Sequence, residues 1–592
     1  MTAQQLRPLL LSAVLATGLS TAAYGVDAEA PDLPEAEPVP GLIGAYVAGM
    51  AAGQRGDADT AAALLLGLSE RVSPQVAVLG PALRAAVSAG LIEEAIPVAR
   101  VLLDLDPRAS EAAILLLLAD AAREGDWEAA KALLALLPGR DLSGTRRDLL
   151  RAWVTLPLEG ADAALEILAP LEERRGLKTL ALVHKALILD IAGDPAAADA
   201  YRAALGESEV PSGRSLLLAS TAFARDGARE EALALIDAEL DRGRNSATLE
   251  ALRAELASGE PLPELVANAS DGVSEVFLQI GAALNSENER LQVMALQEAR
   301  LAAYVAPESR AAALLEAELL SRVERHDEAV SRYEGLLDDP RHGRSAALAR
   351  ADALAAAERL DEAEAAYREL AAAEPDDPEA MMRLGNMLRW DRRFEASAAA
   401  YNEAVARSGE PQELDWVLYY FRGIANERSG DWDAAEADFL LALELRPEQP
   451  QVLNYLGYSW VERKENLAEA KAMLERAVEL RPRDGYIVDS LGWALYKLGE
   501  YEAAVEQLEL AVELDPSQAV INDHLGDAYW RVGRTREAIV QWQRTLSLGE
   551  DPDIDPEEVR RKLVEGLPPV QQADLSAEQA SEELPEAEPS SE

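Results

Sequence analysis

Small and apolar residues recur at a regular interval along the C-terminal half of the chain. A leucine–glycine pair repeats with spacings of 35 and 34 residues, at Leu456-Gly457, Leu491-Gly492 and Leu525-Gly526. A leucine and a proline separated by one residue repeat with the same spacings, at residues 445–447, 480–482 and 514–516. Proline ends a helix because its nitrogen cannot donate to the preceding turn. The pattern predicts consecutive helical hairpins of about 34 residues each.

A 34-residue period is the signature of tetratricopeptide (TPR) repeats. The rhythm predicts seven repeats over residues 310–552, and a degraded form of it predicts TPR-like hairpins over residues 41–245. Residues 246–309 predict an irregular helical connector, where the array is interrupted or the superhelix changes direction. One hairpin cannot bury its apolar face alone, so the hairpins must stack. We therefore expect an all-α fold, a right-handed α-solenoid of about 11 to 13 stacked TPR helix hairpins.

Composition supports helices and excludes two classes of partner. Alanine and leucine dominate, and aromatic residues make up only 5% of the chain, which favours helix over sheet. With 592 residues, the chain is too long for one compact core. The formal net charge of −50 opposes binding to nucleic acid or anionic lipid by bulk electrostatics. We expect a protein or an extended peptide as partner, and contact with a membrane only through partners or an uncleaved N-terminus; the oligomeric state stays open.

The two ends of the chain lie outside the repeats. Residues 8–19 are an apolar stretch that is too short to span a bilayer, and Ala23 and Gly25 supply the small residues of a signal-peptide cleavage site. We expect a signal peptide over residues 1–25, cleaved after Gly25 or Ala23, and a periplasmic protein; an uncleaved anchor is the alternative. Residues 26–40 predict a flexible acidic, proline-rich arm, residues 553–567 a capping helix, and residues 568–592 a disordered acidic tail.

No arrangement of residues in the sequence indicates catalysis. The chain has no cysteine, which excludes disulfides, thiolate metal sites and the lipid-bearing cysteine of a lipoprotein. Phosphate loops, dinucleotide glycine fingerprints and nucleophile elbows are also missing from the sequence. We therefore predict a binding protein rather than an enzyme, with no catalytic residue, metal site or cofactor. The four histidines show no metal-ligand spacing, at His184, His326, His342 and His524.

Aromatic and polar residues recur at the positions of the first helices that line the concave face of a stacked hairpin array. Exposed aromatic side chains in such a groove give a large contact area at small entropic cost. The alternative is that the same side chains pack between adjacent hairpins. The candidate residues of this predicted groove strip are Tyr420, Asn454, Tyr458, Tyr486, Asp489, Trp493, Tyr496, Asp523, Asp527 and Trp530.

The segments 453–460, 485–493 and 521–530, which read LNYLGYSW, GYIVDSLGW and INDHLGDAYW, resemble a proteobacterial family of exported TPR proteins. Members of that group include lipoprotein adaptors that deliver substrates to C-terminal-processing proteases in the cell envelope. This chain differs from them in lacking the lipid-bearing cysteine. It also lacks the basic-plus-asparagine clamp for a peptide carboxylate, because position five of the repeats holds Tyr420, Asn454, Asp489 and Asp523. A basic or extended peptide therefore fits this groove better than an acidic tail.

Together, the repeats, the N-terminal segment and the resemblance predict a non-catalytic scaffold or adaptor in the bacterial cell envelope, with a role in protein assembly or proteolysis. Two alternatives stay open. One is an adaptor anchored on the cytoplasmic side of the membrane. The other is an envelope enzyme with a site in residues 246–309.

Overall fold

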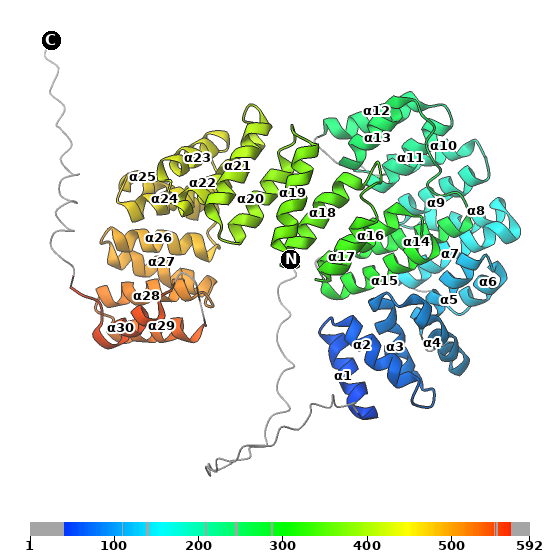
Figure 1. Ribbon diagram of the computed structural model, residues 1–592, viewed down its shortest axis with the longest axis horizontal. Helices are drawn as coiled ribbons and strands as arrows, with labels where there is room; N and C mark the ends of the chain where they lie inside the picture. The colour runs from blue at the N-terminus through cyan, green and yellow to red at the C-terminus, as the bar shows by residue number, and fades with distance from the viewer. Residues whose placement is uncertain are drawn as a thin grey trace.

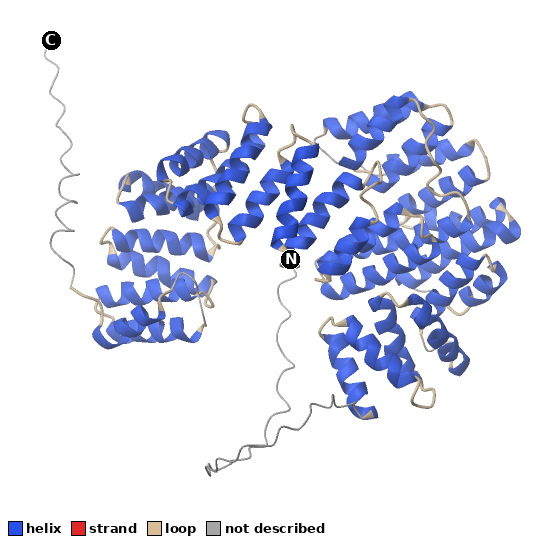
Figure 2. Ribbon diagram, viewed as in Figure 1, coloured by secondary structure: helices blue, strands red, loops and turns tan. Residues whose placement is uncertain are grey.

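The computed structural model describes residues 41–569, except 109, 138–140, 208–209, 243–246, 286–287, 550 and 552–553. The predicted signal peptide and acidic arm lie outside the described residues, as does all but the start of the predicted tail. The described part is built from thirty α-helices and one short 3-10 helix, without a strand (Figure 2). No described helix is both long and apolar enough to cross a bilayer. The chain is an all-α solenoid.

Six helical hairpins form the N-terminal superhelix (Figure 1). In each hairpin the first helix is followed by a glycine with φ between 67° and 91°, a left-handed conformation that side chains with a Cβ rarely adopt. The helices are α1 (Leu42–Gln54), α2 (Ala58–Ser69), α3 (Val76–Ala89), α4 (Ile92–Leu105), α5 (Glu111–Glu124), α6 (Trp127–Leu134), α7 (Asp141–Glu159), α8 (Ala161–Glu172), α9 (Lys178–Ile191), α10 (Ala196–Gly206), α11 (Gly213–Arg225) and α12 (Arg229–Asp241).

The segment expected to be an irregular connector folds back into this superhelix. It contains α13 (Ala247–Ser258), which packs on α12, and the hairpin of α14 (Ala269–Leu284) and α15 (Glu289–Val305). Helix α14 packs against α5 and α7, and α15 packs against α3 and α5. These are the first helices of their hairpins, so α14 and α15 fill the concave face of the N-terminal superhelix (Figure 1).

A glycine lets α14 approach the floor of this concave face. The backbone of Gly272 lies directly on the indole ring of Trp153, which is fully buried on α7. A Cβ at residue 272 would stand 2.1 Å from Cε3 of that ring. The indole Nε1–H donates to Nδ1 of His184 on α9 over 2.9 Å. Val273, Val276 and Phe277 complete the contact and are fully buried. The hairpin therefore belongs to the hydrophobic core of the N-terminal half.

Buried ion pairs hold α15 in the same face. Arg146 of α7 pairs with Glu298 of α15 and with Glu111 of α5. Burial raises the pKa of Glu298 to about 7 against the opposing charge of Arg146. Arg300, only 3% exposed, donates to the backbone carbonyl of Val87 over 3.1 Å. Since a buried charge is costly without a partner, these pairs specify where the hairpin lies.

Seven hairpins follow as an arc (Figure 1). Their first helices contact one another along the concave side. The residues inserted between the third and fourth hairpins contain the 3-10 helix η1 (Glu413–Asp415). The helices are α16 (Arg310–Arg322), α17 (His326–Glu334), α18 (Gly343–Ala356), α19 (Leu360–Ala373), α20 (Glu379–Trp390), α21 (Phe394–Ser408), α22 (Trp416–Ser429), α23 (Trp432–Leu445), α24 (Pro450–Arg463), α25 (Leu467–Leu480), α26 (Gly485–Lys497), α27 (Tyr501–Leu514), α28 (Ala519–Arg531) and α29 (Thr535–Ser547).

A last helix, α30 (Pro556–Glu565), packs on α29 and closes the end of the arc. In the described residues the hairpins number six in the N-terminal superhelix, one inside it and seven in the arc, which is more than the expected 11 to 13 because α14 and α15 also pair. Arg325, at the start of α17, donates to Asp59 of α2 over 2.7 Å. The N-terminal superhelix thus closes on the first hairpin of the arc.

Candidate functional site

The predicted groove strip lies on four successive first helices of the arc, α22, α24, α26 and α28. Tyr486 is its one exposed residue, with 54% of its surface accessible. Asp489, Asp523 and Asp527 are buried, and the remaining members are half-buried. The structure therefore brings the predicted residues onto one side of the arc, but most of them contact a neighbouring repeat.

The centre of the strip is a stack of rings between α26 and α28. The indole of Trp493 stacks on the imidazole of His524 with centroids 3.9 Å apart, and on Tyr496 with centroids 4.7 Å apart. His524 Nδ1 lies 3.0 Å from the carboxylate of Asp489. Although burial acts in the opposite direction, the charge of Asp489 raises the pKa of His524. The indole N–H of Trp493 donates to Glu462 over 2.7 Å, so this stack joins three repeats.

The capping helix covers the end of the strip. Lys562 of α30 donates to Asp523 over 2.7 Å and to Asp527 over 2.9 Å. Burial and the neighbouring charge of Asp523 raise the pKa of Asp527 to about 6, against the opposing effect of Lys562. Gly566 lies against the ring of Trp530, where an added Cβ would be 1.9 Å from Cζ2. These three strip residues are therefore engaged by the chain itself.

The other end of the strip packs into the core between α22 and α24. Tyr420 lies 6.1 Å from Tyr455 and 6.2 Å from Phe439, measured between ring centroids, and burial raises its pKa to about 12. Asn454, on α24, has a buried side-chain oxygen that finds no hydrogen-bond partner in the part of the chain that the structure describes, and Tyr458 is half-buried on the same helix. Packing between hairpins is thus the observed role of Tyr420.

The sequence interpretation missed a wider hollow on the two repeats before the strip. A groove of about 810 Å³ runs over α18 and α20, with Asp352 and Ala355 on one side and Met382, Asn386 and Trp390 on the other. Trp390 is 78% exposed. The sequence does contain the signal for this hollow. If Leu384 of the leucine–glycine pair is counted as position seven of its repeat, the three α20 residues fall at positions that line the concave face, as the strip residues do in later repeats. The predicted groove strip contains residues of the last four repeats only.

A second hollow of about 760 Å³ adjoins the first and shares Glu379 and Arg383 with it. Its other wall is α13, through Ala247 and Glu250. We refer to the two hollows together as the α18–α20 groove. It lies where the closed N-terminal superhelix meets the arc, a junction that is also joined by the ion pair of Arg341 with Glu255, at 2.8 Å.

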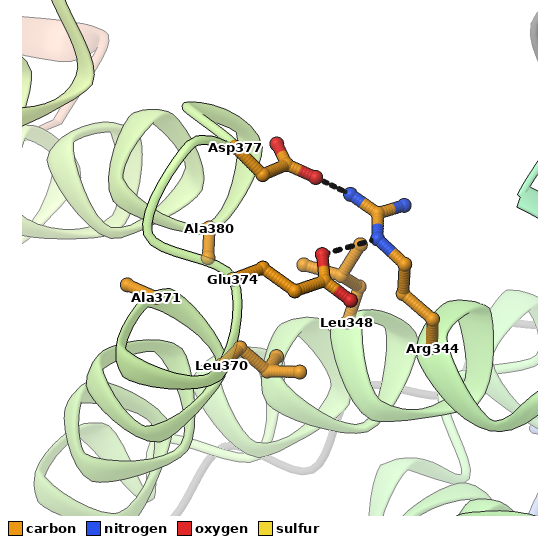
Figure 3. Close-up of a pocket in the computed structure, with 7 residues that line it drawn as sticks. All are labelled: Arg344, Leu348, Leu370, Ala371, Glu374, Asp377 and Ala380. Carbon is orange, nitrogen blue, oxygen red and sulfur yellow. Dashed lines mark hydrogen bonds and ion pairs between the residues drawn. The ribbon is translucent and has the colours of Figure 1, made fainter. Parts of the chain in front are cut away.

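Arg344 lines the second hollow of the α18–α20 groove, and it also borders a small adjoining pocket, drawn in Figure 3, where its guanidinium reaches Glu374 and Asp377. Its guanidinium pairs with Glu374 over 2.7 Å, with Glu379 over 3.0 Å, and also with Asp377. These carboxylates raise the pKa of Arg344 against the effect of burial. The arginine thereby holds the turn that joins α19 to α20. Its charge is satisfied within the floor of the second hollow, which is rigid for that reason.

The described residues offer no group of three or more histidine and carboxylate side chains that could hold a metal ion. In the region 246–309, the buried carboxylates of Glu275 and Glu298 are each bonded to an arginine of the N-terminal superhelix, Arg214 and Arg146 respectively. Paired in this way, they stabilise the contact between the hairpin and the superhelix.

The folded chain is a stacked-hairpin solenoid with an open concave face on its C-terminal arc. Models of the tetratricopeptide repeat match residues 314–378, 348–411, 391–450 and 422–484, and a TPR repeat model matches residues 492–533. The C-terminal region of the chain therefore consists of TPR repeats. This agrees with the 34-residue rhythm in the sequence.

Comparison with known proteins gives one curated relative and several solved structures. The TPR repeat-containing protein PA4667 of Pseudomonas aeruginosa is 32% identical over 90 residues, which are 15% of this chain and 15% of that protein. The hetero-tetramer Cut9-Hcn1 of the APC/C aligns with 88% of this chain and 96% of its own, at 15% identity and a TM-score of 0.36. MamA from Desulfovibrio magneticus RS-1 aligns with 30% of this chain and 97% of its own, at 22% identity and a TM-score of 0.26.

Proposed function

We propose that this chain is a non-catalytic scaffold or adaptor that binds polypeptide partners on the concave face of its arc. The observation that carries the proposal is a difference between the two halves. The concave face of the N-terminal superhelix is filled by α14 and α15, whereas the arc keeps the α18–α20 groove open. Because α14 and α15 occupy the concave face of the N-terminal superhelix, that half has a supporting role, and the arc contacts the partners.

We further propose that the protein works in the bacterial cell envelope, in the assembly or proteolysis of envelope proteins. The apolar stretch at residues 8–19, followed by small residues at Ala23 and Gly25, supports export through a signal peptide. N-terminal sequencing of the mature protein tests this directly. A start at Val26 or Tyr24 supports export. An intact N-terminus would instead favour the adaptor anchored on the cytoplasmic side.

Capture of partners by the purified full chain from a periplasmic extract, with chemical cross-linking, tests the binding role. We expect Trp390→Ala, which removes an exposed ring from the open α18–α20 groove, to weaken capture while helix content, measured by circular dichroism, stays nearly unchanged. Trp530→Ala serves as a contrast, because Gly566, directly after α30, lies against that ring, and loss of the ring should lower stability. If the wild-type chain captures no protein, and instead turns over a substrate, the scaffold proposal is wrong.

A further inference from the structure

We propose that the α18–α20 groove is the docking site for a cationic, extended segment of the partner, which places an apolar side chain against Trp390. This inference rests on the proposed scaffold function and adds a location and a chemistry to it. It moves the main contact away from the predicted groove strip, whose residues largely bind one another or α30.

The shape of the groove suits an extended chain. Its two hollows share Glu379 and Arg383, so they form one continuous path from α13 across α18 to the end of α20. The walls are regular helices, and the floor is held by Arg344 and its carboxylates. A preformed groove lowers the entropic cost of binding.

An apolar anchor point lies at one end of this path. Trp390 exposes 78% of its surface, beside Met382 and Met387 in the wall of the groove. The guanidinium of Arg389 lies 5.3 Å from the Trp390 ring centroid and 4.5 Å from that of Phe421. Exposed indoles in hollows are typical of residues that dominate binding energy. A leucine or aromatic side chain of a partner would bury this ring.

The charge of the groove determines which other side chains the partner segment should carry. Its two arginines, Arg344 and Arg383, are already paired with carboxylates. Glu250, Glu358 and Asp391 line the groove and are exposed, and none of the three has an ion pair among the described residues. Unpaired carboxylates at an open groove attract lysine and arginine side chains. A second copy of this chain, with its net charge of −50, would be repelled.

A labelled peptide tests the inference on the full chain. The probe is a fluorescein-labelled peptide in which lysine and leucine alternate, and its binding is followed by fluorescence anisotropy at physiological salt. We expect saturable binding, and no binding of a matched peptide in which glutamate replaces lysine. Trp390→Ala should weaken binding about tenfold or more, and Asp391→Lys several-fold.

Two matched variants separate this groove from general charge attraction. Tyr486→Ala removes an exposed aromatic residue from the predicted groove strip, and Glu475→Lys reverses an exposed charge on α25. Both should bind the probe as the wild type does. The inference is overturned if Trp390→Ala binds with unchanged affinity, if Glu475→Lys weakens binding as much as Asp391→Lys, or if binding does not saturate.

Partner capture distinguishes this inference from the proposed function. If the wild type captures a protein and the double variant Trp390→Ala, Asp391→Lys captures it equally well, the chain is a scaffold but the α18–α20 groove is not its docking site. If the wild type captures nothing, the scaffold function itself fails. Loss of capture only in the double variant, with an unchanged circular dichroism spectrum, supports both.

Discussion

At the scale of single residues, the closest contact between the α14–α15 hairpin and the superhelix depends on a missing side chain. Gly272→Ala would place a Cβ 2.1 Å from the Trp153 ring, and that ring has no room to move because it is fully buried. We expect a loss of about 1–3 kcal/mol in the free energy of unfolding, measured by urea denaturation. Gly53→Ala is the matched control, since its nearest contact would be 3.7 Å away. An unchanged midpoint for Gly272→Ala would contradict the observed packing.

A second residue-scale prediction concerns acid. Burial lowers the pKa of His184 from 6.5 to about 4, so the folded state holds this imidazole neutral. The contribution of neutral His184 to the free energy of unfolding is therefore fully present above about pH 6.5. It is lost as the pH falls toward 4, because in that range only the unfolded state takes up the proton. We expect a loss of about 1 kcal/mol between about pH 7.5 and 5.5 from this group.

Comparison with His184→Gln isolates that effect, because glutamine keeps an acceptor for the indole N–H of Trp153 but does not titrate. Urea midpoints at the two pH values should fall further for the wild type than for the variant. Parallel losses in both proteins would mean that other groups, not His184, carry the acid sensitivity.

At the scale of an element, one lysine forms the buried ion pairs between α30 and the arc. Lys562→Met would leave Asp523 and Asp527 buried without a cation, and breaking such a buried pair costs about 3–5 kcal/mol. Because the pKa of Asp527 is raised to about 6, the penalty should be larger above that pH, where the carboxylate is charged. We expect faster hydrogen exchange in α28 and α30 and a changed emission of Trp530.

Arg560→Met is the control for this element, since within the described residues the ion pair of Arg560 is an exposed one with Glu557 on the same helix. Such pairs contribute little, so exchange in α28 should stay as in the wild type. If Lys562→Met behaves like Arg560→Met, then α30 is held by its apolar contacts alone.

At the scale of the whole molecule, the filled superhelix and the open arc should differ in how they fluctuate. Helix α14 is enclosed by α5, α7, α15 and α16, whereas α1, the first described helix, exposes Leu42, Ile43 and Val47. Local opening follows burial, so native-state hydrogen exchange should be slowest in α14 and among the fastest in α1. Rapid exchange across both α14 and α15 would show that the hairpin leaves the concave face.

Much of the fold could be predicted from the sequence, because the residues that specify each hairpin lie close together in the chain. Gly56, Gly90 and Gly125 mark turns, and the leucine–glycine pairs mark crossings between helices that are neighbours in the chain. The candidate site was harder to predict from the sequence. Concave positions follow from the repeat count, but whether a side chain there is free depends on the next repeat. Trp493 and Trp390 both occupy concave positions of their repeats, nine and thirteen respectively when leucine of the leucine–glycine pair is counted as seven, yet the first is stacked and the second exposed.

The sequence by itself determined that this chain stacks helical hairpins with a 34-residue period, because each hairpin is specified by small residues and prolines within reach of its neighbours. Only the tertiary structure decided that α14 and α15 return to fill the first superhelix. The contacts that hold them join residues far apart, such as Gln297 with Ser88, 209 positions away. No spacing rule encodes such pairs, since they arise from the accumulated rotation of many stacked hairpins.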